Sequence, residues 1–310
     1  MLRKIIVIFS SVLCLYLPSA HAEAPAVSLN QPRQQIDAAP KRGVLFKVSA
    51  ADHTLFLFGT IHVGTADFYP LESTVMNALA RASRIALEID PLNASQAQIS
   101  VMRYGIYPSA KTLPLKLPQK TRLTALLKAR GLTYATVATM KPWLAATVMT
   151  LNEFSRQGFR SEFGVDNFIA GYARANNKPL VELETIDAQL ATFGTLTERD
   201  QLRYLDDTMA EIEDRSGIEK VTQLTRLWRD ADRAGIDAMA VELAADPTFS
   251  GGFFQKVLLD DRNPGLASGI EKLLKAEVDS FAGIGMFHLV GKQSVPDILQ
   301  QRGYRVERVY

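Results

Sequence analysis

The alternation of apolar and polar positions places the start of the folded chain near Gly43. Val44, Phe46 and Val48 share one side of an extended segment, as in a half-buried strand. After a turn at residues 51–53, residues 55–58 are apolar on both faces, which suits a central strand covered on both sides. We therefore expect a hairpin that delivers a buried strand into Gly59.

A helical pattern follows, because apolar residues between positions 71 and 82 recur at intervals of three and four. Residues 84–89 predict the next strand. Such a strand–helix–strand segment should give two neighbouring parallel strands joined by a right-handed crossover. Residues 179–183 predict a further strand, and helical patterns dominate the chain between these two.

Residues 186–276 are almost wholly helical in pattern. Strand character returns at residues 279–284, a helix begins at the capping box of Ser294 and stops near Gly303, and residues 304–309 predict an edge strand. The sequence therefore predicts an α/β fold. Its central sheet is mixed but largely parallel and flanked by helices, with a large helical insertion between the later strands.

The first 22 residues have the pattern of a secretory signal. A basic start is followed by an apolar stretch at residues 5–18 and by Ala20-His21-Ala22, a small-x-small cleavage site. We expect cleavage near Ala22, a periplasmic or secreted protein, and no stable membrane span afterwards; an uncleaved anchor is the alternative. Residues 23–42 predict a flexible lead-in, and residues 43–310 a single domain.

The amino-acid composition excludes several classes of site and partner. The only cysteine, Cys14, lies in the leader, so the mature chain has no disulfides, no cysteine nucleophile and no zinc–thiolate site. The net charge is +2, and cleavage removes Arg3 and Lys4, which leaves a neutral chain. We therefore expect no nucleic-acid partner, since such a partner favours a basic protein surface.

The four histidines carry the main functional signal. His62 and His288 each end a Gly-x-x-His tract that follows an apolar run, Gly59–His62 near one end of the chain and Gly285–His288 near the other. Two such tracts in so histidine-poor a chain predict that its ends fold together around a joint metal or acid–base site. The alternative is that each is a hydrogen-bonded structural histidine. His53 is expected to be an exposed turn residue.

Polar tracts terminate four strand-like runs, and ligand sites in open α/β sheets lie beyond the carboxyl ends of strands. We therefore expect four side chains to converge: His62, Glu88, Glu184 and His288. Two imidazoles and a carboxylate with an open position form a catalytic zinc pattern, and manganese, iron or cobalt would also suit these ligands. Glu88 as a solvated strand end and Glu184 as part of a helix cap are the structural alternatives.

Three other polar residues are weaker candidates. Arg262, beside Asn263, is a natural clamp for a carboxylate or developing oxyanion, although a surface ion-pair cluster is the simpler interpretation of the local spacing. Asp166 most simply caps a helix or complements its dipole. Asp90 precedes a proline and most simply belongs to a turn.

The tracts, taken in order, resemble those of the TraB/GumN family, bacterial relatives of the animal TIKI metalloproteases. The resemblance covers residues 43–309, and its motifs are Phe58–His62, Leu87–Asp90, Gly164–Asp166, Leu183–Thr185 with Gln189, Arg262–Asn263, and Gly285–Gly291. It implies an α/β fold related to the erythromycin-esterase and haem-binding ChaN-like group. In TIKI proteins the paired Gly-x-x-His motifs serve a manganese- or cobalt-dependent peptidase.

Carried over by this resemblance, His62 and His288 become metal ligands with Glu88 beside them, and Glu184 and Arg262 match further family positions. The second motif departs from the usual Gly-Ala-Gly-His because it contains Met286 and Phe287. The bulk of Phe287 is expected to narrow the pocket, so the substrate preference of the TIKI proteins is not expected for this protein.

The leading hypothesis is a metal-dependent hydrolase that acts on a peptide or another small hydrolysable substrate. Its divalent ion (manganese, cobalt or zinc) would be held by His62, His288 and Glu88, with Glu88, Glu184 and Arg262 as catalytic residues and the helical insertion as a wall or lid. A second hypothesis is a metal-independent, esterase-like hydrolase with His62 as general base and Glu88 as the partner that orients it or activates water. A third is a haem- or metal-binding protein without turnover. The oligomeric state stays open.

Overall fold

The computed structural model describes residues 33–50, 53–108, 111–276 and 278–310. The predicted signal segment and the first half of the predicted lead-in, residues 23–32, lie outside these residues. Residues 33–38 of the lead-in form a short helix, α1, none of whose side chains is buried. Among the described residues, no helix is both long enough and apolar enough to span a lipid bilayer.

One six-stranded sheet forms the centre of the fold, and the strands lie in the order β4-β3-β5-β2-β1-β6. Neighbouring strands from β4 to β2 are parallel, whereas β1 runs antiparallel to both β2 and β6. This mixed, largely parallel sheet confirms the predicted fold class. The strand bounds are β1 Leu45–Ala50, β2 His53–Thr60, β3 Arg84–Leu87, β4 Leu180–Glu182, β5 Ser280–Gly285 and β6 Arg305–Arg308.

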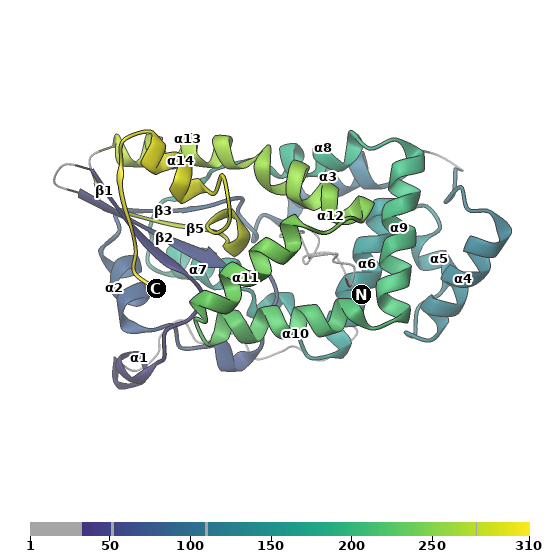
Figure 1. Cartoon of the computed structure of the whole chain (residues 1–310), viewed down its shortest axis with the longest axis horizontal. Coiled ribbons are helices and arrows are strands. Elements are labelled where there is room, and N and C mark those ends of the chain that lie inside the picture. Colours follow the sequence, from purple (N-terminus) through teal and green to yellow (C-terminus); the bar gives the residue numbers. More distant parts are fainter. Residues whose placement is uncertain (1–32, 51–52, 109–110, 277) are drawn as a thin grey trace.

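Helices cover both faces of the sheet and extend the molecule at one end. Figure 1 shows α13 and α14 above the sheet and α2 and α7 below it. Helices α3–α6, α8, α9 and α12 form a helical half at the other end, and α10 and α11 run between this half and the sheet. The bounds are α2 Ser73–Arg81, α3 Ala94–Gly105, α4 Leu117–Lys128, α5 Tyr134–Val137, α6 Pro142–Arg156, α7 Val165–Ala175, α8 Ile186–Gly194, α9 Glu198–Glu213, α10 Ser216–Arg229, α11 Arg233–Ala244, α12 Phe249–Phe253, α13 Asn263–Leu274 and α14 Val295–Gln301.

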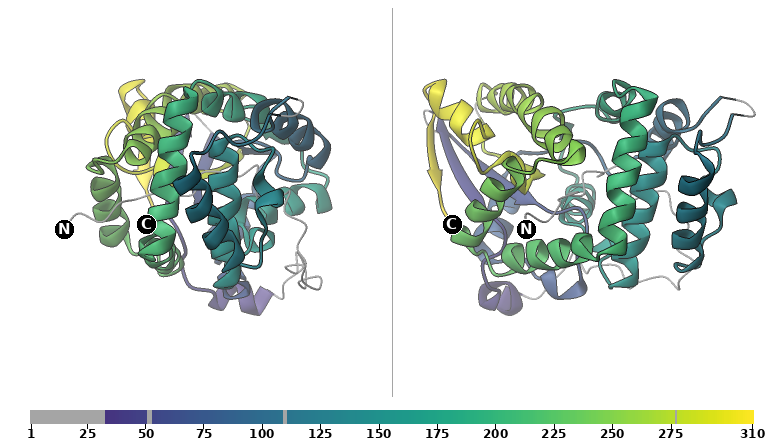
Figure 2. Two further views of the ribbon diagram at one scale, coloured as in Figure 1. Left: turned by 90° about the vertical axis from the view of Figure 1, so that its right-hand side faces the viewer. Right: turned by 45° about the vertical axis from the view of Figure 1, so that its right-hand side comes forward.

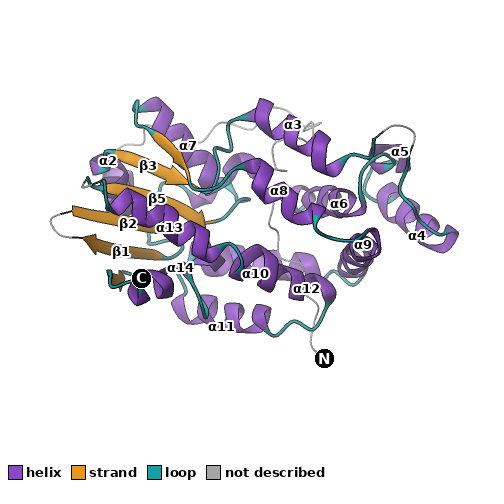
Figure 3. Ribbon diagram, turned by 90° about the horizontal axis from the view of Figure 1, so that it is seen from above, coloured by secondary structure: helices purple, strands orange, loops and turns teal. Residues whose placement is uncertain are grey.

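The predicted helical insertion is confirmed between β4 and β5. It includes the π-helix η4 (Phe254–Asp260), which leads directly towards α13. In the helical half, α6 and α9 lie side by side, as both views of Figure 2 show. Seen from above, the arrows of β2 and β3 point towards this half (Figure 3), so the carboxyl ends of the parallel strands face it.

The hairpin β1–β2, the buried strand before Gly59 and the edge strand β6 are where the hydrophobic pattern predicted them. Two expectations are wrong. β2 and β3 are parallel but not neighbours, because β5 lies between them and pairs with both. His53 is not an exposed turn residue: it begins β2, is half-buried, and its Nε2 lies 2.5 Å from the carbonyl oxygen of Leu274.

Trp228 of α10 ties the helical insertion to the sheet. Its indole N–H donates to the carbonyl of Gly59 at 2.8 Å, and its ring stacks on Phe68 with 4.8 Å between centroids. Its own carbonyl accepts the Gly43 N–H at 2.6 Å. A Cβ at residue 43 would lie only 2.5 Å from the indole nitrogen, and the φ of +66° also requires glycine here.

Candidate functional site

The four residues expected to converge all follow adjacent parallel strands. His62 lies two residues after β2, Glu88 directly after β3, and Glu184 two residues after β4. His288 ends the short 3₁₀ helix η5 (Met286–His288), which follows β5. Because β5 pairs with both β2 and β3, the two Gly-x-x-His tracts are neighbours across the sheet edge.

The backbone of the second tract approaches Gly59, the glycine that begins the first tract, too closely for a side chain. A Cβ on Gly59 would lie 3.2 Å from the Cα of Met286, which is tighter than an ordinary contact. Thr60 is paired with Gly285 in the parallel ladder. The two tracts are therefore packed backbone to backbone before either histidine begins.

Arg262, just ahead of α13, holds two glutamates together. Its Nη2 donates to Glu88 Oε2 and to Glu184 Oε2, both at 2.5 Å, and its Nε contacts both carboxylate oxygens of Glu184. Nη1 donates to the carbonyl of Leu258 in the π-helix at 3.1 Å. Gln189 of α8 adds its amide N–H groups to the same two carboxylates, at 3.0 and 2.8 Å.

The second oxygen of Glu88 faces the histidine side of the cluster. Oε1 accepts the backbone N–H of Gly285 at 2.7 Å and lies 3.8 Å from Nε2 of His288. Burial raises the pKa of Glu88, but the charge of Arg262, the two imidazoles and the Gly285 N–H outweigh it and lower this pKa to about 2. Glu88 is therefore an anion at neutral pH.

His288 is fully buried, and its ring orientation is fixed by Asn263 of α13. Nδ1 lies 2.6 Å from the side-chain oxygen of Asn263, whose amide nitrogen donates to the carbonyl of Gln293 at 2.9 Å. This arrangement assigns the proton of a neutral ring to Nδ1 and the lone pair to Nε2. Burial lowers the pKa of His288 to about 3, against the charge of Glu88, so the ring is neutral.

His62 is anchored in the same manner by Asp166, near the start of α7. Its Nδ1 donates to Asp166 Oδ2 at 2.6 Å, and both side chains are buried. Burial lowers the pKa of His62, but the charge and hydrogen bond of Asp166 outweigh this effect, and the pKa lies above its ordinary value. As in His288, Nε2 is the ring nitrogen that the hydrogen bond to Asp166 does not use.

Gly164 lets α7 reach His62. A Cβ at this residue would lie 2.5 Å from the backbone oxygen of His62, and the N–H of Val165 donates to the carbonyl of Ile61 at 2.9 Å. The Gly164-Val165-Asp166 tract thus docks directly on the first Gly-x-x-His turn. Asp166 lies in the first turn of α7, where its charge suits the helix dipole, but the N-cap residue is Gly164 and the Asp166 carboxylate bonds to His62 instead of capping the helix.

The interpretation of Arg262 and Asn263 as a surface ion-pair cluster is wrong. The Arg262 side chain is 9% exposed and Asn263 is 2% exposed, because the π-helix and α13 turn both inward at the sheet edge. Sequence reasoning assigned no role to Asn263 or Gln189; their place in the family-like tracts was the only signal. Asp90 does belong to a turn, since its carboxylate accepts the Leu92 N–H and pairs with Arg174.

The charges of the cluster suit a cation. Glu88 and Glu184 share the guanidinium of Arg262, and Asp166 bonds to His62. These three carboxylates and one guanidinium carry a net charge of −2, which protonation of His62 reduces to −1. Taking charges out of water requires compensation, and a divalent ion would supply it.

The donor atoms also suit a divalent transition metal in kind. Metal-bound histidines typically donate their other ring N–H to an oxygen, as His62 and His288 both do. Two ligands about 2.1 Å from an ion in a tetrahedral site lie about 3.4 Å apart, close to the 3.8 Å between His288 Nε2 and Glu88 Oε1. Within the described part of the chain, however, no group of three or more histidine, cysteine, aspartate and glutamate side chains is arranged so that it could hold a metal ion, so the cluster is not a ready-made metal site.

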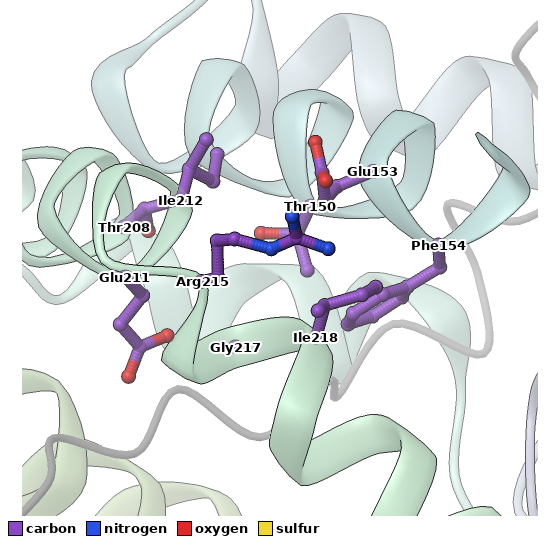
Figure 4. A pocket seen from close by; sticks show the side chains of 9 residues that line it. All are labelled: Thr150, Glu153, Phe154, Thr208, Glu211, Ile212, Arg215, Gly217 and Ile218. Carbon is purple, nitrogen blue, oxygen red and sulfur yellow. The ribbon is translucent and has the colours of Figure 1, made fainter. Parts of the chain in front are cut away.

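The described residues also line cavities beside and beyond this cluster. One, of about 440 Å³, is bounded by α11, the π-helix η4 and residues 287–293, and Asn263 and Phe287 are among its lining residues. Phe287 is buried edge-on against Phe254. A second cavity, between α6, α9 and α10, measures about 20 Å³; Figure 4 shows the Arg215 side chain beside Thr150 and Glu153 there. The smaller one has room for little more than one water molecule.

Comparison with known proteins gives the chain relatives over almost its whole described length. YbaP of Escherichia coli (strain K12) is 24% identical over 270 residues, which cover 84% of this chain and 96% of YbaP, and YbaP of Shigella flexneri matches equally. A protein of Treponema pallidum (strain Nichols) is 20% identical over 274 residues, 84% of this chain and 81% of its own length. All three are described as uncharacterised.

No solved structure was found to match the chain. A family model, in contrast, matches residues 44–308, a range that contains all six strands and every residue of the cluster. The chain therefore belongs to the TraB/PrgY/gumN family.

Proposed function

We propose that this protein is a periplasmic, metal-dependent hydrolase that cleaves peptides or other small hydrolysable substrates. The observation that carries the proposal is the matched anchoring of two imidazoles near the carboxylate of Glu88, His62 by Asp166 and His288 by Asn263. In this proposal Nε2 of each ring and Oε1 of Glu88 hold a divalent ion such as manganese, cobalt or zinc. When bound, that ion would lower the pKa of a water molecule and polarise the scissile carbonyl.

The chain's own residues would then act by orientation. Asp166 and Asn263 keep the lone pairs of both rings at Nε2, and Gly285 fixes Oε1 of Glu88. Arg262, already bonded to two carboxylates, is better suited to positioning Glu88 than to clamping an oxyanion. Glu184 accepts hydrogen bonds from the same guanidinium and so fixes the position of the Arg262 side chain.

Elemental analysis and a peptide-hydrolysis assay test the proposal. Protein purified without its first 22 residues should retain about one divalent ion per chain after dialysis and should cleave members of a peptide library. Chelation should abolish cleavage, and so should His62→Ala and His288→Ala. His53→Ala is the matched control, because this half-buried histidine contacts Leu274 and not the cluster. Bound metal with no turnover on any peptide or ester would favour a metal-binding protein and contradict the hydrolase, and a Soret band would reveal haem.

The alternative is a metal-independent hydrolase, and the His62–Asp166 pair favours it. A buried aspartate that orients a histidine and raises its pKa is the arrangement of a general base. Turnover that survives chelation and complete metal removal, but is lost in Asp166→Asn, would support this alternative and overturn the metal-dependent mechanism.

The proposed location rests on the first 22 residues, which lie outside the described structure. Expression of the full chain in a Gram-negative host should give a periplasmic product that begins at Glu23. A product in the membrane fraction that still carries residues 1–22 would contradict it.

A further inference from the structure

The 440 Å³ pocket behind His288 has the size and lining of a small-molecule site. Binding pockets of this kind measure about 300–1,000 Å³ and combine apolar walls with a few fixed polar groups. The apolar wall here comes from Ala240, Leu243 and Ala244 of α11 and from Phe287. Some of the lining residues, among them Val241 and Lys292, are exposed, so the pocket opens to the surface.

Two charges of opposite sign lie on the wall and come from different elements. Asp260 ends the π-helix η4, and the amide of Gln255 donates to its Oδ1 at 2.8 Å, which fixes the carboxylate. Lys292 lies in the loop after η5, which turns through left-handed conformations at Gly291 and Gln293. Asp260 and Lys292 are the charged members of the lining.

The pocket also contacts the group that orients His288. Asn263 lines it and bonds to Nδ1 of His288 and to the carbonyl of Gln293, another lining residue. An occupant would therefore lie against the far side of the anchor, opposite the Nε2 that faces Glu88. The π-helix strengthens the case, since π-helical turns occur frequently at functional sites.

From these observations we infer that the pocket binds a small zwitterion of the amino-acid type with an apolar side chain. Asp260 receives the ammonium group, Lys292 receives the carboxylate, and the side chain packs on α11 and Phe287. A ligand with one charge alone would leave the other wall charge unmatched. Binding here does not require that the protein hydrolyse peptides, so the inference stands or falls separately from the proposed function.

Titration calorimetry on the metal-free protein without residues 1–22 tests the inference with three probes. L-leucine should bind with a dissociation constant below about 1 mM, and L-leucinamide and N-acetyl-L-leucine, which each lack one charge, should bind about tenfold more weakly. Equal binding of all three probes, or no binding of leucine, would overturn it.

Variants locate the binding. Asp260→Asn and Lys292→Met should each weaken leucine binding about tenfold. Asp261→Asn is the matched control, because this exposed neighbour pairs with Lys256 and does not line the pocket. If Asp260→Asn binds leucine as well as Asp261→Asn does, the inference is wrong. Should Asp260→Asn fail to fold, Lys292→Met on the exposed loop still decides the question.

A proton NMR readout places the ligand without any variant. Leucine should shift the imidazole signals of His288 through Asn263, and those of His53, which lies elsewhere, should stay in place. A shift of His53 alone would put the ligand outside this pocket and overturn the assignment.

Discussion

At the scale of single residues, Arg262 decides how the cluster is held together. Its guanidinium is nearly buried and bonds to Glu88 and Glu184, so that two carboxylates share one cation. Breaking a buried ion pair from one side leaves an uncompensated charge, which is far more damaging than losing an exposed pair. Here removal would leave two carboxylates facing each other with only the amide of Gln189 between them.

Arg262→Ala should therefore lower the free energy of unfolding by about 3–5 kcal/mol. Arg262→Lys should recover only part of this loss, because an ammonium group cannot reproduce the forked contacts. Urea denaturation measures the effect, with Arg174→Ala as the exposed control pair, for which we expect a loss below about 1 kcal/mol. Similar losses in the two alanine variants would show that Arg262 is not a structural clamp.

The His62–Asp166 pair gives a prediction that NMR can read directly, because the described chain holds three histidines: His53, His62 and His288. In the metal-free protein His62 should titrate above the ordinary pKa of about 6.5, since Asp166 outweighs burial. In Asp166→Asn burial remains and the opposing charge is lost, so its pKa should fall below about 6.5. His62 titrating above this value in both proteins would rule out Asp166 as the cause.

At the scale of elements, the position of α7 depends on a glycine for reasons of packing. The φ of Gly164 is −62°, which any residue adopts, but a Cβ would collide with the backbone oxygens of His62 and Ser161. Backbone atoms cannot move aside as the end of a side chain can. A larger residue must therefore push α7, and Asp166 with it, away from the first Gly-x-x-His turn.

Gly164→Ala should lower the free energy of unfolding by about 1–3 kcal/mol through overpacking. It should also bring the pKa of His62 down, because the bond to Asp166 lengthens. Gly252→Ala is the control: a Cβ there meets nothing within 4 Å, and the loss of chain entropy on substitution should leave stability unchanged or raise it by about 0.4–1 kcal/mol. Thermal unfolding and NMR titration check both, and equal stability of the two variants would refute the collision argument.

Elements also mark the limit of what the sequence predicts. Strand ends were readable because buried runs stop at Gly59 and Gly285, and the carboxyl ends of parallel strands share one edge. The place of β5 between β2 and β3 was not readable, since pairing across more than 190 residues leaves no local pattern. The sequence did not predict that Asp166 and Asn263 orient the two histidines, for the same reason: each bonds to a histidine that only the tertiary fold brings near.

At the scale of the whole molecule, the question is whether the helical half and the sheet form one cooperative unit. Trp228 joins them at the strand that leads to His62, through its hydrogen bond to Gly59 and its stacking on Phe68. The other tryptophan, Trp143 of α6, lies inside the helical half, fully buried and stacked on Phe193 at 4.5 Å. Trp143 thus reports on the helical half, and Trp228 reports on the junction between that half and the sheet.

Trp228→Phe removes the donor to the buried Gly59 carbonyl and should lower the free energy of unfolding by about 1–3 kcal/mol. In this variant the fluorescence of Trp143 reports the helical half alone, whereas far-ultraviolet circular dichroism reports the whole chain. Coincident urea transitions are expected, because the cluster draws its anchors from both the sheet edge and the insertion. Trp143→Phe, with Trp228 as the remaining reporter, should give the same coincidence at the junction with the sheet. Separate transitions in either variant would mean that the helical half unfolds by itself and that the molecule is not one cooperative unit.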